Sequence, residues 1–335
     1  MKHFLDLLGQ GAENARDLVR LATRLEQTPE PTALAGKVLG LIFMNPSLRT
    51  LASFQAGMAR LGGNSFVITP QGSWQLEFET GVPMTGNAAE HVREAIPVLA
   101  SYADALGIRA FAGGKDLDAD LAEPVLSAVA EVCPVPLINL ESAFDHPCQA
   151  LADWKTLDDL GVPAAGGRFV LSWAQHPKPL PQAVPAAVLR MAAMRGMDVT
   201  VLRPDGFGLP QPIMDEAAAA ARASGGTVTQ TSDRASAMDG AHVLYAKSWT
   251  ATDHYGDPAG EAALRAGLEG WTVEEDWFGP AALDCGFMHC LPVRREVVVS
   301  ADVLEGPRSR VIAQARNRMY AQMAVLHRLL AKGEN

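Results

Sequence analysis

Residues 37–51 read KVLGLIFMNPSLRTL, an apolar run that is followed by a short polar turn and then by a helical pattern. The run 37–44 predicts a buried β-strand, and we expect a helix to begin near Thr50. Between them, Ser47, Arg49 and Thr50 place two hydroxyls and a guanidinium at a helix N-terminus, where backbone N–H groups and the helix dipole favour an anion. A plain N-cap is the alternative, but an arginine adds nothing to capping. The stretch therefore predicts a phosphate site between a strand and a helix.

Short apolar runs and helical patterns continue to alternate along the rest of the chain. Further strands are expected at residues 65–69, 105–111, 135–140, 168–173, 198–203, 227–231, 242–246 and 286–289. Helices are expected to begin near residues 89, 117, 149, 182, 212 and 234, with a last helix at 315–330. This alternation predicts an α/β fold with parallel sheets covered by helices on both faces. Ligands of such sheets bind at the carboxyl ends of the strands.

Composition and charge exclude several classes of protein. A chain of 335 residues exceeds what one core covers, so we expect two domains of about 150 residues each. The formal net charge of -10 argues against a nucleic-acid partner. No apolar run reaches the roughly 20 residues that span a bilayer, and the N-terminal residues lack a secretory pattern, so we expect a cytoplasmic protein without a membrane partner. Four cysteines without C-x-x-C spacing argue against a disulfide framework and a structural zinc site.

Three more polar clusters interrupt apolar strands downstream: His146-Pro147-Cys148-Gln149, His176-Pro177-Lys178-Pro179 and His289-Cys290-Leu291-Pro292. With these motifs the chain resembles the aspartate/ornithine carbamoyltransferase family, whose motifs are S-x-R-T-R for phosphate, H-P-x-Q for the carbonyl and H-C-L-P for the amine. The resemblance covers most of the chain. It is closest to the group that acts on N-acylornithines, which residues 176–184, 245–249 and 287–295 resemble. Leu51 departs from the pattern, because the family has its second arginine there.

The resemblance implies a fold of two doubly wound domains. These are a carbamoyl phosphate-binding domain at residues 1–150 and an N-acylornithine-binding domain at 151–312, with a C-terminal helix at 313–335 that packs on the first domain. It also implies a knotted connection at the Pro-rich loop 176–185, for which a rigid interdomain turn is the alternative. The implied assembly is a homotrimer with small-molecule substrates, no cofactor and no metal.

The resemblance also assigns roles to single residues. Carbamoyl phosphate would be bound by Ser47, Leu48, Arg49, Thr50, Trp74, Arg109, His146, Gln149, Cys290, Leu291 and Arg318. Of these, Arg109, His146, Gln149 and Cys290 are assigned to catalysis. The N-acylornithine pocket would be lined by Ala89, Glu141, His176, Lys247 and Arg294. Trp74, on the polar loop 70–75, would reach the site of a neighbouring subunit.

Plainer interpretations of four of these residues stay open. Arg109 could be an ordinary surface arginine, and Trp74 could fold onto its own loop. His146 could belong to a simple helix start with a proline in the first turn. Cys290 could be a buried cysteine without a role, and a covalent nucleophile is not needed because the carbamoyl donor is already activated.

The implied reaction transfers the carbamoyl group of carbamoyl phosphate to the δ-amine of N-succinyl-L-ornithine, giving N-succinyl-L-citrulline and phosphate in arginine biosynthesis. Two positions favour succinyl: Ala89 stands where acetyl-type enzymes have a glutamate, and Val298 where they have a lysine. Loss of a carboxylate makes room for the extra succinyl carboxylate and removes its repulsion.

The nearest alternative is an N-acetylornithine enzyme, followed by ornithine or aspartate carbamoyltransferases. A nucleotide-dependent oxidoreductase is a less favoured alternative, because no G-x-G-x-x-G motif follows the first strand of this chain. A noncatalytic binding paralogue stays open as an alternative because of Leu51.

Overall fold

The structure, a computed structural model, describes residues 1–69 and 72–331. Pro70 and Gln71 of the predicted Trp74 loop, and residues 332–335 of the predicted C-terminal segment, lie outside the described residues. The chain divides into two compact units. Unit 1 comprises Met1–Gly113, Asp118–Cys148 and Arg318–Asn335, and unit 2 comprises Gly114–Leu117 and Gln149–Asn317. Two helices cross these boundaries: α6 (Pro147–Asp159) and α12 (Val311–Leu330).

Unit 1 is built on a four-stranded parallel sheet in the order β2-β1-β5-β6. Its strands are β1 (Val38–Phe43), β2 (Asn64–Ile68), β5 (Ala105–Arg109) and β6 (Leu137–Glu141). Its helices are α1 (Gly11–Gln27), α2 (Leu48–Arg60), α3 (Val92–Ser101), α4 (Leu117–Leu121), whose first residue falls in unit 2, and α5 (Pro124–Val132). Strands β5 and β6 are buried along their whole length, as expected for parallel strands covered on both faces.

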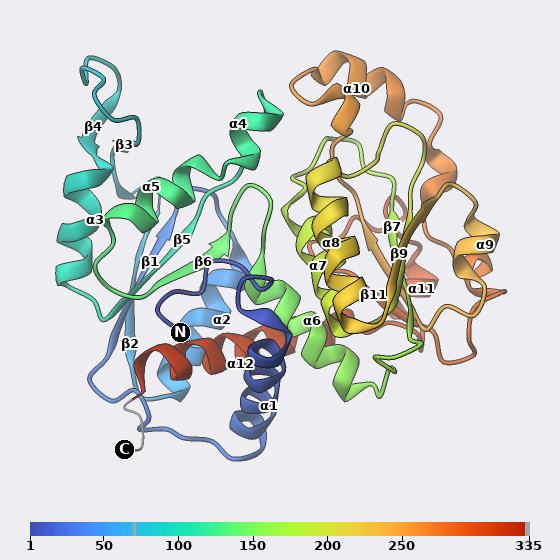
Figure 1. Cartoon of the computed structure of the whole chain (residues 1–335), viewed down its shortest axis with the longest axis horizontal. Helices are drawn as coiled ribbons and strands as arrows, with labels where there is room; N and C mark the ends of the chain where they lie inside the picture. The colour runs from blue at the N-terminus through green and yellow to red at the C-terminus, as the bar shows by residue number, and fades with distance from the viewer. Residues whose placement is uncertain (70–71, 332–335) are drawn as a thin grey trace. The chain divides into compact units, whose positions relative to one another are not determined.

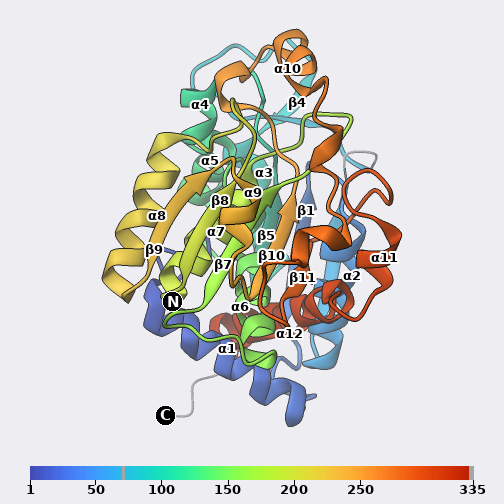
Figure 2. The same cartoon turned by 90° about the vertical axis from the view of Figure 1, so that its right-hand side faces the viewer.

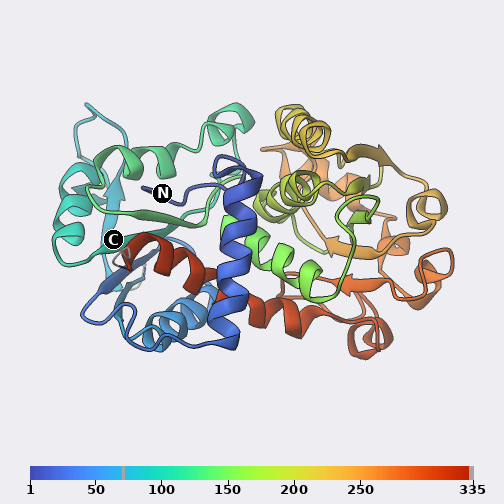
Figure 3. The same cartoon turned by 60° about the horizontal axis from the view of Figure 1, so that its bottom comes forward.

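Helices cover both faces of this sheet. Figures 1 and 3 show α3 and α5 on one face and α2 with the C-terminal part of α12 on the other. Gly57 lets α2 approach α12 closely, because a Cβ at this position would lie 3.2 Å from the side chain of Met323. A small separate ribbon, β3 (Gln75–Glu77) paired in parallel with β4 (Ala88–His91), precedes α3. The last helix thus supplies part of the cover of unit 1.

Unit 2 is built on a five-stranded parallel sheet in the order β11-β10-β7-β8-β9, which Figure 2 shows from β9 to β11. Its strands are β7 (Arg168–Trp173), β8 (Asp198–Leu202), β9 (Thr227–Thr231), β10 (Val243–Lys247) and β11 (Gly286–Met288). Its further helices are α7 (Ala183–Arg195), α8 (Gln211–Ser224), α9 (Arg234–Met238), α10 (Pro258–Arg265) and α11 (Ala301–Glu305). Single 3₁₀ turns lie at Thr252–His254, Glu269–Trp271 and Glu275–Phe278.

The two faces of the second sheet are covered differently. Helices α7 and α8 lie on one face, and α9 and α11 on the other (Figure 1). Helix α7 is buried all round rather than on one stripe, which agrees with its run of Ala, Val, Leu and Met. The other face is closed by a core that includes Leu244, Trp277, Phe287 and Val298.

The predicted α/β class, with parallel sheets in two parts, is confirmed. The helix expected near residue 89 is wrong at its start, because Ala88–His91 form strand β4 and α3 begins only at Val92. Helices α1, α5, α10 and α11 and the β3-β4 ribbon were not expected. The knotted connection and the predicted domain limits stay predictions. No helix within residues 1–69 and 72–331 is long and apolar enough to cross a membrane.

Candidate active site

The N-terminus of α2 carries the predicted phosphate motif. Ser47 is the N-cap, with an extended backbone, and its Oγ accepts a hydrogen bond from the backbone N–H of Thr50 at 3.3 Å. The Ser47 hydroxyl also donates to Thr50 Oγ1 at 2.9 Å, and Arg318 Nη2 donates to the same Thr50 oxygen at 2.7 Å. The first turn of α2 holds no acidic residue, so nothing there offsets the positive end of the helix dipole. This end of the helix is arranged for an anion.

Arg109, Glu141 and His146 come together at the ends of two neighbouring strands. The register of the parallel pair β5-β6 places Arg109 opposite Glu141, and the two side chains form a buried ion pair. His146 Nε2 lies 3.4 Å from Glu141 Oε2, and the Arg109 guanidinium lies 4.5 Å from the centre of the Phe111 ring. Glu141 thereby holds both a guanidinium and an imidazole at the carboxyl edge of the first sheet.

The charges around His146 explain its protonation state. Burial, followed by the positive charges of Arg318, Arg109 and Arg49, lowers the pKa of His146 well below its usual value, so the imidazole is neutral near pH 7. Among the described residues, the buried Nε atoms of Arg109 and Arg318 and Nδ1 of His146 have no hydrogen-bond partner. Leaving such groups unsatisfied costs about 1–3 kcal/mol each. The two arginine Nε–H groups can therefore offer donors and excess positive charge to an anion with many oxygens.

In unit 2 the segment after β11 holds Cys290 and Leu291. Cys290 is buried, and the backbone of Leu291 lies in the left-handed region, with φ of 56°. The backbone N–H of Leu291 donates to His289 Nδ1 at 2.9 Å, and that of His289 donates to Gln314 Oε1 at 3.0 Å. A non-glycine residue in the left-handed region costs about 1 kcal/mol or more, so these contacts hold an unfavourable turn in place.

His176 and Arg294, also in unit 2, are in direct contact. Arg294 Nε donates to His176 Nε2 at 3.1 Å, and His176 Nδ1 lies 2.8 Å from the carbonyl oxygen and 3.1 Å from the backbone nitrogen of Lys178. The pKa of His176 is lowered first by burial and further by the charges of Lys247, Arg294 and Arg265, against the opposing hydrogen bond to Lys178. A neutral imidazole among three cations can contribute to a site for a carboxylate.

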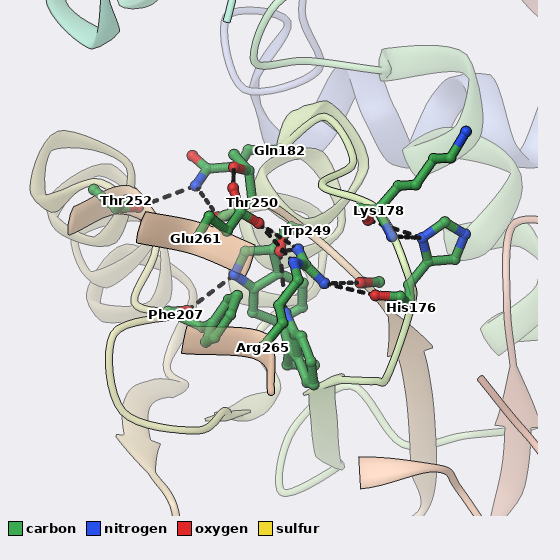
Figure 4. Close-up of polar contacts among 11 residues, drawn as sticks. His176, Lys178, Gln182, Phe207, Trp249, Thr250, Thr252, Glu261 and Arg265 are labelled. Carbon is green, nitrogen blue, oxygen red and sulfur yellow. Dashed lines mark hydrogen bonds and ion pairs between the residues drawn. The ribbon is translucent and has the colours of Figure 1, made fainter. Parts of the chain in front are cut away.

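A buried ion pair supports this region, as Figure 4 shows. Arg265 pairs with Glu261 and donates to the backbone carbonyls of His176 at 3.1 Å and Trp249 at 2.8 Å. Gln182 Nε2 donates to the Thr250 carbonyl at 2.8 Å. The network ties the Pro-rich loop to the segment after β10. Sequence reasoning missed Arg265 and Glu261, although their i, i+4 spacing on a helix is the signal for an ion pair.

Trp74 and Ala89 stand in and beside the β3-β4 ribbon of unit 1. Trp74 is 60% exposed, and its indole Nε1–H donates to Glu90 Oε2 at 2.9 Å. Ala89, which precedes Glu90 on β4, is exposed. A cavity of about 540 Å³ beside the ribbon is lined by Trp74 and by apolar side chains such as Val98 and Leu99. These features leave an aromatic, partly apolar surface on unit 1.

The predicted site residues therefore fall into separate groups. Unit 1 brings together Ser47, Arg49, Thr50, Arg109, His146 and Arg318, with Leu48 in the first turn of α2, and it holds Trp74 and Ala89 at the ribbon. Unit 2 holds Gln149, Cys290, Leu291, His176, Lys247 and Arg294. Glu141, assigned by resemblance to the N-acylornithine pocket, contacts Arg109 and His146 in unit 1. Val298 is 2% exposed and belongs to the apolar core of unit 2.

Two family models match the chain. Residues 2–159 match the carbamoyl-P binding domain of aspartate/ornithine carbamoyltransferase, and residues 183–329 match its Asp/Orn binding domain. An N-acetylornithine carbamoyltransferase of Xanthomonas campestris pv. campestris is 37% identical over 99% of this chain and 98% of its own. An N-succinylornithine carbamoyltransferase of Bacteroides thetaiotaomicron is 37% identical over 88% of this chain and 87% of its own.

A solved structure is similar over nearly the whole chain. It is an N-acetyl-L-ornithine transcarbamylase with one glutamate replaced by alanine, complexed with carbamyl phosphate and N-succinyl-L-norvaline. Its TM-score is 0.95 at 37% identity, covering 98% of this chain and 100% of the other. Both domain models, the relatives and this structure agree with the motifs at the strand ends. The chain belongs to the aspartate/ornithine carbamoyltransferase family.

Proposed function

We propose that this protein transfers the carbamoyl group of carbamoyl phosphate to the δ-amine of an N-acyl-L-ornithine, within arginine biosynthesis. The observation that carries the proposal is the cluster at the N-terminus of α2, where Thr50 contacts Arg318 and three guanidiniums act on a neutral His146. Carbamoyl phosphate brings a phosphate dianion and a carbonyl, and both gain from donors that are held in place before the reaction. Matches to domains named for carbamoyl-P and for Asp/Orn binding support the same pair of substrates.

In the proposed mechanism, the phosphate is bound by Ser47, Leu48, Arg49, Thr50 and Arg318. Thr50, Arg109, His146 and Gln149 hold the carbamoyl group. The uncharged amine attacks the carbonyl carbon, forming a C–N bond, while the C–O bond to phosphate breaks and phosphate leaves with the electron pair. The proton released from the amine passes to phosphate or solvent. Donors around the carbonyl oxygen stabilise the negative charge that develops on it.

The acceptor is proposed to bind unit 2 residues. Cys290 and the carbonyl of Leu291 orient the amine. The cations Lys247 and Arg294, together with the neutral imidazole of His176, take the α-carboxylate of the amino acid. A free alkyl ammonium has a pKa near ~10, so removal of its proton precedes attack. The hydrogen bond between Arg294 and His176 supports a preformed carboxylate site rather than one assembled by the ligand.

We further propose that the acyl group is succinyl. The small, exposed side chain of Ala89 removes a carboxylate that the acetyl type carries, and with it the repulsion of the succinyl carboxylate. The similar solved structure fits this reasoning, since a glutamate replacement there accompanies a succinyl ligand. Val298 carries less weight than Ala89, because its side chain is buried in the core. N-acetyl-L-ornithine is the alternative acceptor, supported by the acetyl-type relatives.

The test compares N-succinyl-L-ornithine, N-acetyl-L-ornithine and L-ornithine as acceptors with carbamoyl phosphate as donor. We expect kcat/KM to be highest for the succinyl substrate and lowest for unmodified ornithine. A preference for the acetyl substrate would select the alternative acceptor. If none of the three acceptors gives a citrulline product, the protein is a noncatalytic paralogue, the alternative that the departure at Leu51 suggests.

Trp74 leads to a prediction about assembly. We propose a homotrimer in which the exposed Trp74 of one subunit completes the site of the next. Mixing inactive Trp74→Ala chains with inactive Arg49→Ala chains should then restore activity, because about a quarter of the sites in an equal mixture carry neither lesion. The measurement is citrulline formation after confirmed subunit exchange.

The matched control mixes Arg49→Ala with Arg318→Ala chains. Both lesions lie in the same cluster of one chain, so every hybrid site keeps one of them and no activity should return. Recovery in the control, or none in the Trp74 mixture, would contradict a site shared through Trp74.

A further inference from the structure

A chain of buried hydrogen bonds in unit 2 ends at Gln149. The backbone N–H of His289 donates to Gln314 Oε1 at 3.0 Å, and Gln314 Nε2 donates to Asp153 Oδ1 at 2.8 Å. Gln149 Nε2 donates to the same Asp153 oxygen at 2.7 Å. The side chains of Gln314 and Asp153 are fully buried, and Gln149 is 1% exposed, so water does not compete for these contacts.

The chemistry of the donors and acceptors fixes the direction of each bond. A backbone N–H can only donate, so Gln314 must turn its oxygen to His289 and its NH₂ to Asp153. Asp153 Oδ1 accepts, so it requires the NH₂ end of Gln149 as well. The amide oxygen of Gln149 is thereby directed away from Asp153.

That oxygen is buried and has no hydrogen-bond partner among residues 1–69 and 72–331. A buried acceptor without a donor costs about 1–3 kcal/mol, so the arrangement favours a ligand that brings an N–H group. The carbamoyl NH₂ of the proposed donor substrate is such a group, whereas its carbonyl oxygen is not. The free end of Gln149 therefore matches the nitrogen side of a carbamoyl group.

We propose that Asp153 is a positioning residue, which selects the end of the Gln149 amide that meets the carbamoyl group. The inference rests on the proposed function, in which Gln149 holds that group. If Asp153 were absent, the amide could rotate and present its NH₂ to the ligand, where it would face the carbamoyl NH₂ as donor against donor. Asp153 would then act on the reaction only through Gln149.

A double-mutant cycle of Asp153→Leu and Gln149→Ala tests this dependence. We expect each single variant to lower kcat/KM for carbamoyl phosphate about tenfold to about 10²-fold, and the double variant to lose no more than the worse single one. KM for the acceptor should stay unchanged throughout. Asp153→Asn keeps an acceptor oxygen and should retain most of the activity.

The matched control is Asp159→Leu on the same helix. Asp159 also links α6 to α12, by accepting from Asn317 Nδ2 at 2.9 Å, but it has no bond to Gln149. This variant should lose thermal stability without a change in kcat/KM. Equal losses of kcat/KM in Asp159→Leu and Asp153→Leu would make the role of Asp153 structural and overturn the proposal.

Two further outcomes separate the claims. If the losses of kcat/KM in the two single variants multiply in the double variant, the positioning role is overturned. Unchanged kinetics in Gln149→Ala would instead contradict the proposed function of Gln149. If Asp153→Leu does not fold, Asp153→Thr replaces it in the cycle, since a hydroxyl both donates and accepts and no longer selects one end of the amide. In the cycle with Asp153→Thr, the double variant is again expected to lose no more kcat/KM than the worse single variant.

Discussion

Arg49→Ala should lower the turnover of carbamoyl phosphate by about 10²-fold to about 10³-fold while the fold stays intact. Arg49 lies in the first turn of α2, beside the Ser47 cap and the hydroxyl of Thr50 that binds Arg318. A guanidinium offers two parallel donors to a dianion, and water in a closed site cannot replace that geometry. The measurements are kcat, KM for carbamoyl phosphate and the temperature of unfolding.

Arg60→Ala provides the control for this loss. Arg60 is exposed at the opposite end of the same helix, so its replacement removes an equal charge far from the N-terminus. We expect Arg60→Ala to keep normal kinetics. Near-normal turnover in Arg49→Ala would remove carbamoyl phosphate from the N-terminus of α2.

The second large effect concerns specificity. Ala89→Glu should penalise N-succinyl-L-ornithine more than N-acetyl-L-ornithine, so that the preference between them narrows or inverts. Two like charges about 4 Å apart repel by ~1 kcal/mol in bulk water and by ~4 kcal/mol at an effective dielectric of about 20. Those limits correspond to about a fivefold and about a 10³-fold loss for the succinyl substrate. The quantity to measure is the ratio of kcat/KM for the two acceptors.

Ala89→Gln separates charge from size in the same experiment. Glutamine has the volume of glutamate without its charge, so it should cost the succinyl substrate only the lost space. If glutamine and glutamate change the ratio equally, repulsion is not the cause. An unchanged ratio in both variants would show that Ala89 does not face the acyl group.

The strand-turn-helix of β1 and α2 could be predicted because its signals are local. An apolar run ends at Phe43, and a hydroxyl cap at Ser47 opens the helix. The β3-β4 ribbon could not be predicted in this way. Its strands are short and carry polar residues such as Glu90 and His91, whose pattern continues into α3. Pairing between distant short segments, rather than periodicity, makes them strands.

The placement of Glu141 shows a second limit of sequence reasoning. The resemblance assigned it to the acceptor pocket, which stays a prediction, and the register of β5 with β6 sets it opposite Arg109. Only the order of strands in the sheet reveals that neighbourhood. Arg265 is similar, since nothing in its local sequence shows that it is buried against the carbonyls of His176 and Trp249.

Arg318 reaches Thr50 from a position 268 residues later in the chain. Residues 149–317 belong to unit 2, so the ribosome makes all of that unit before it makes the arginine that completes unit 1. Co-translational folding from the N-terminus is the usual order for multidomain chains. Here the nascent first unit lacks the helix that packs on Gly57, and its anion site stays incomplete until the second unit has been synthesised.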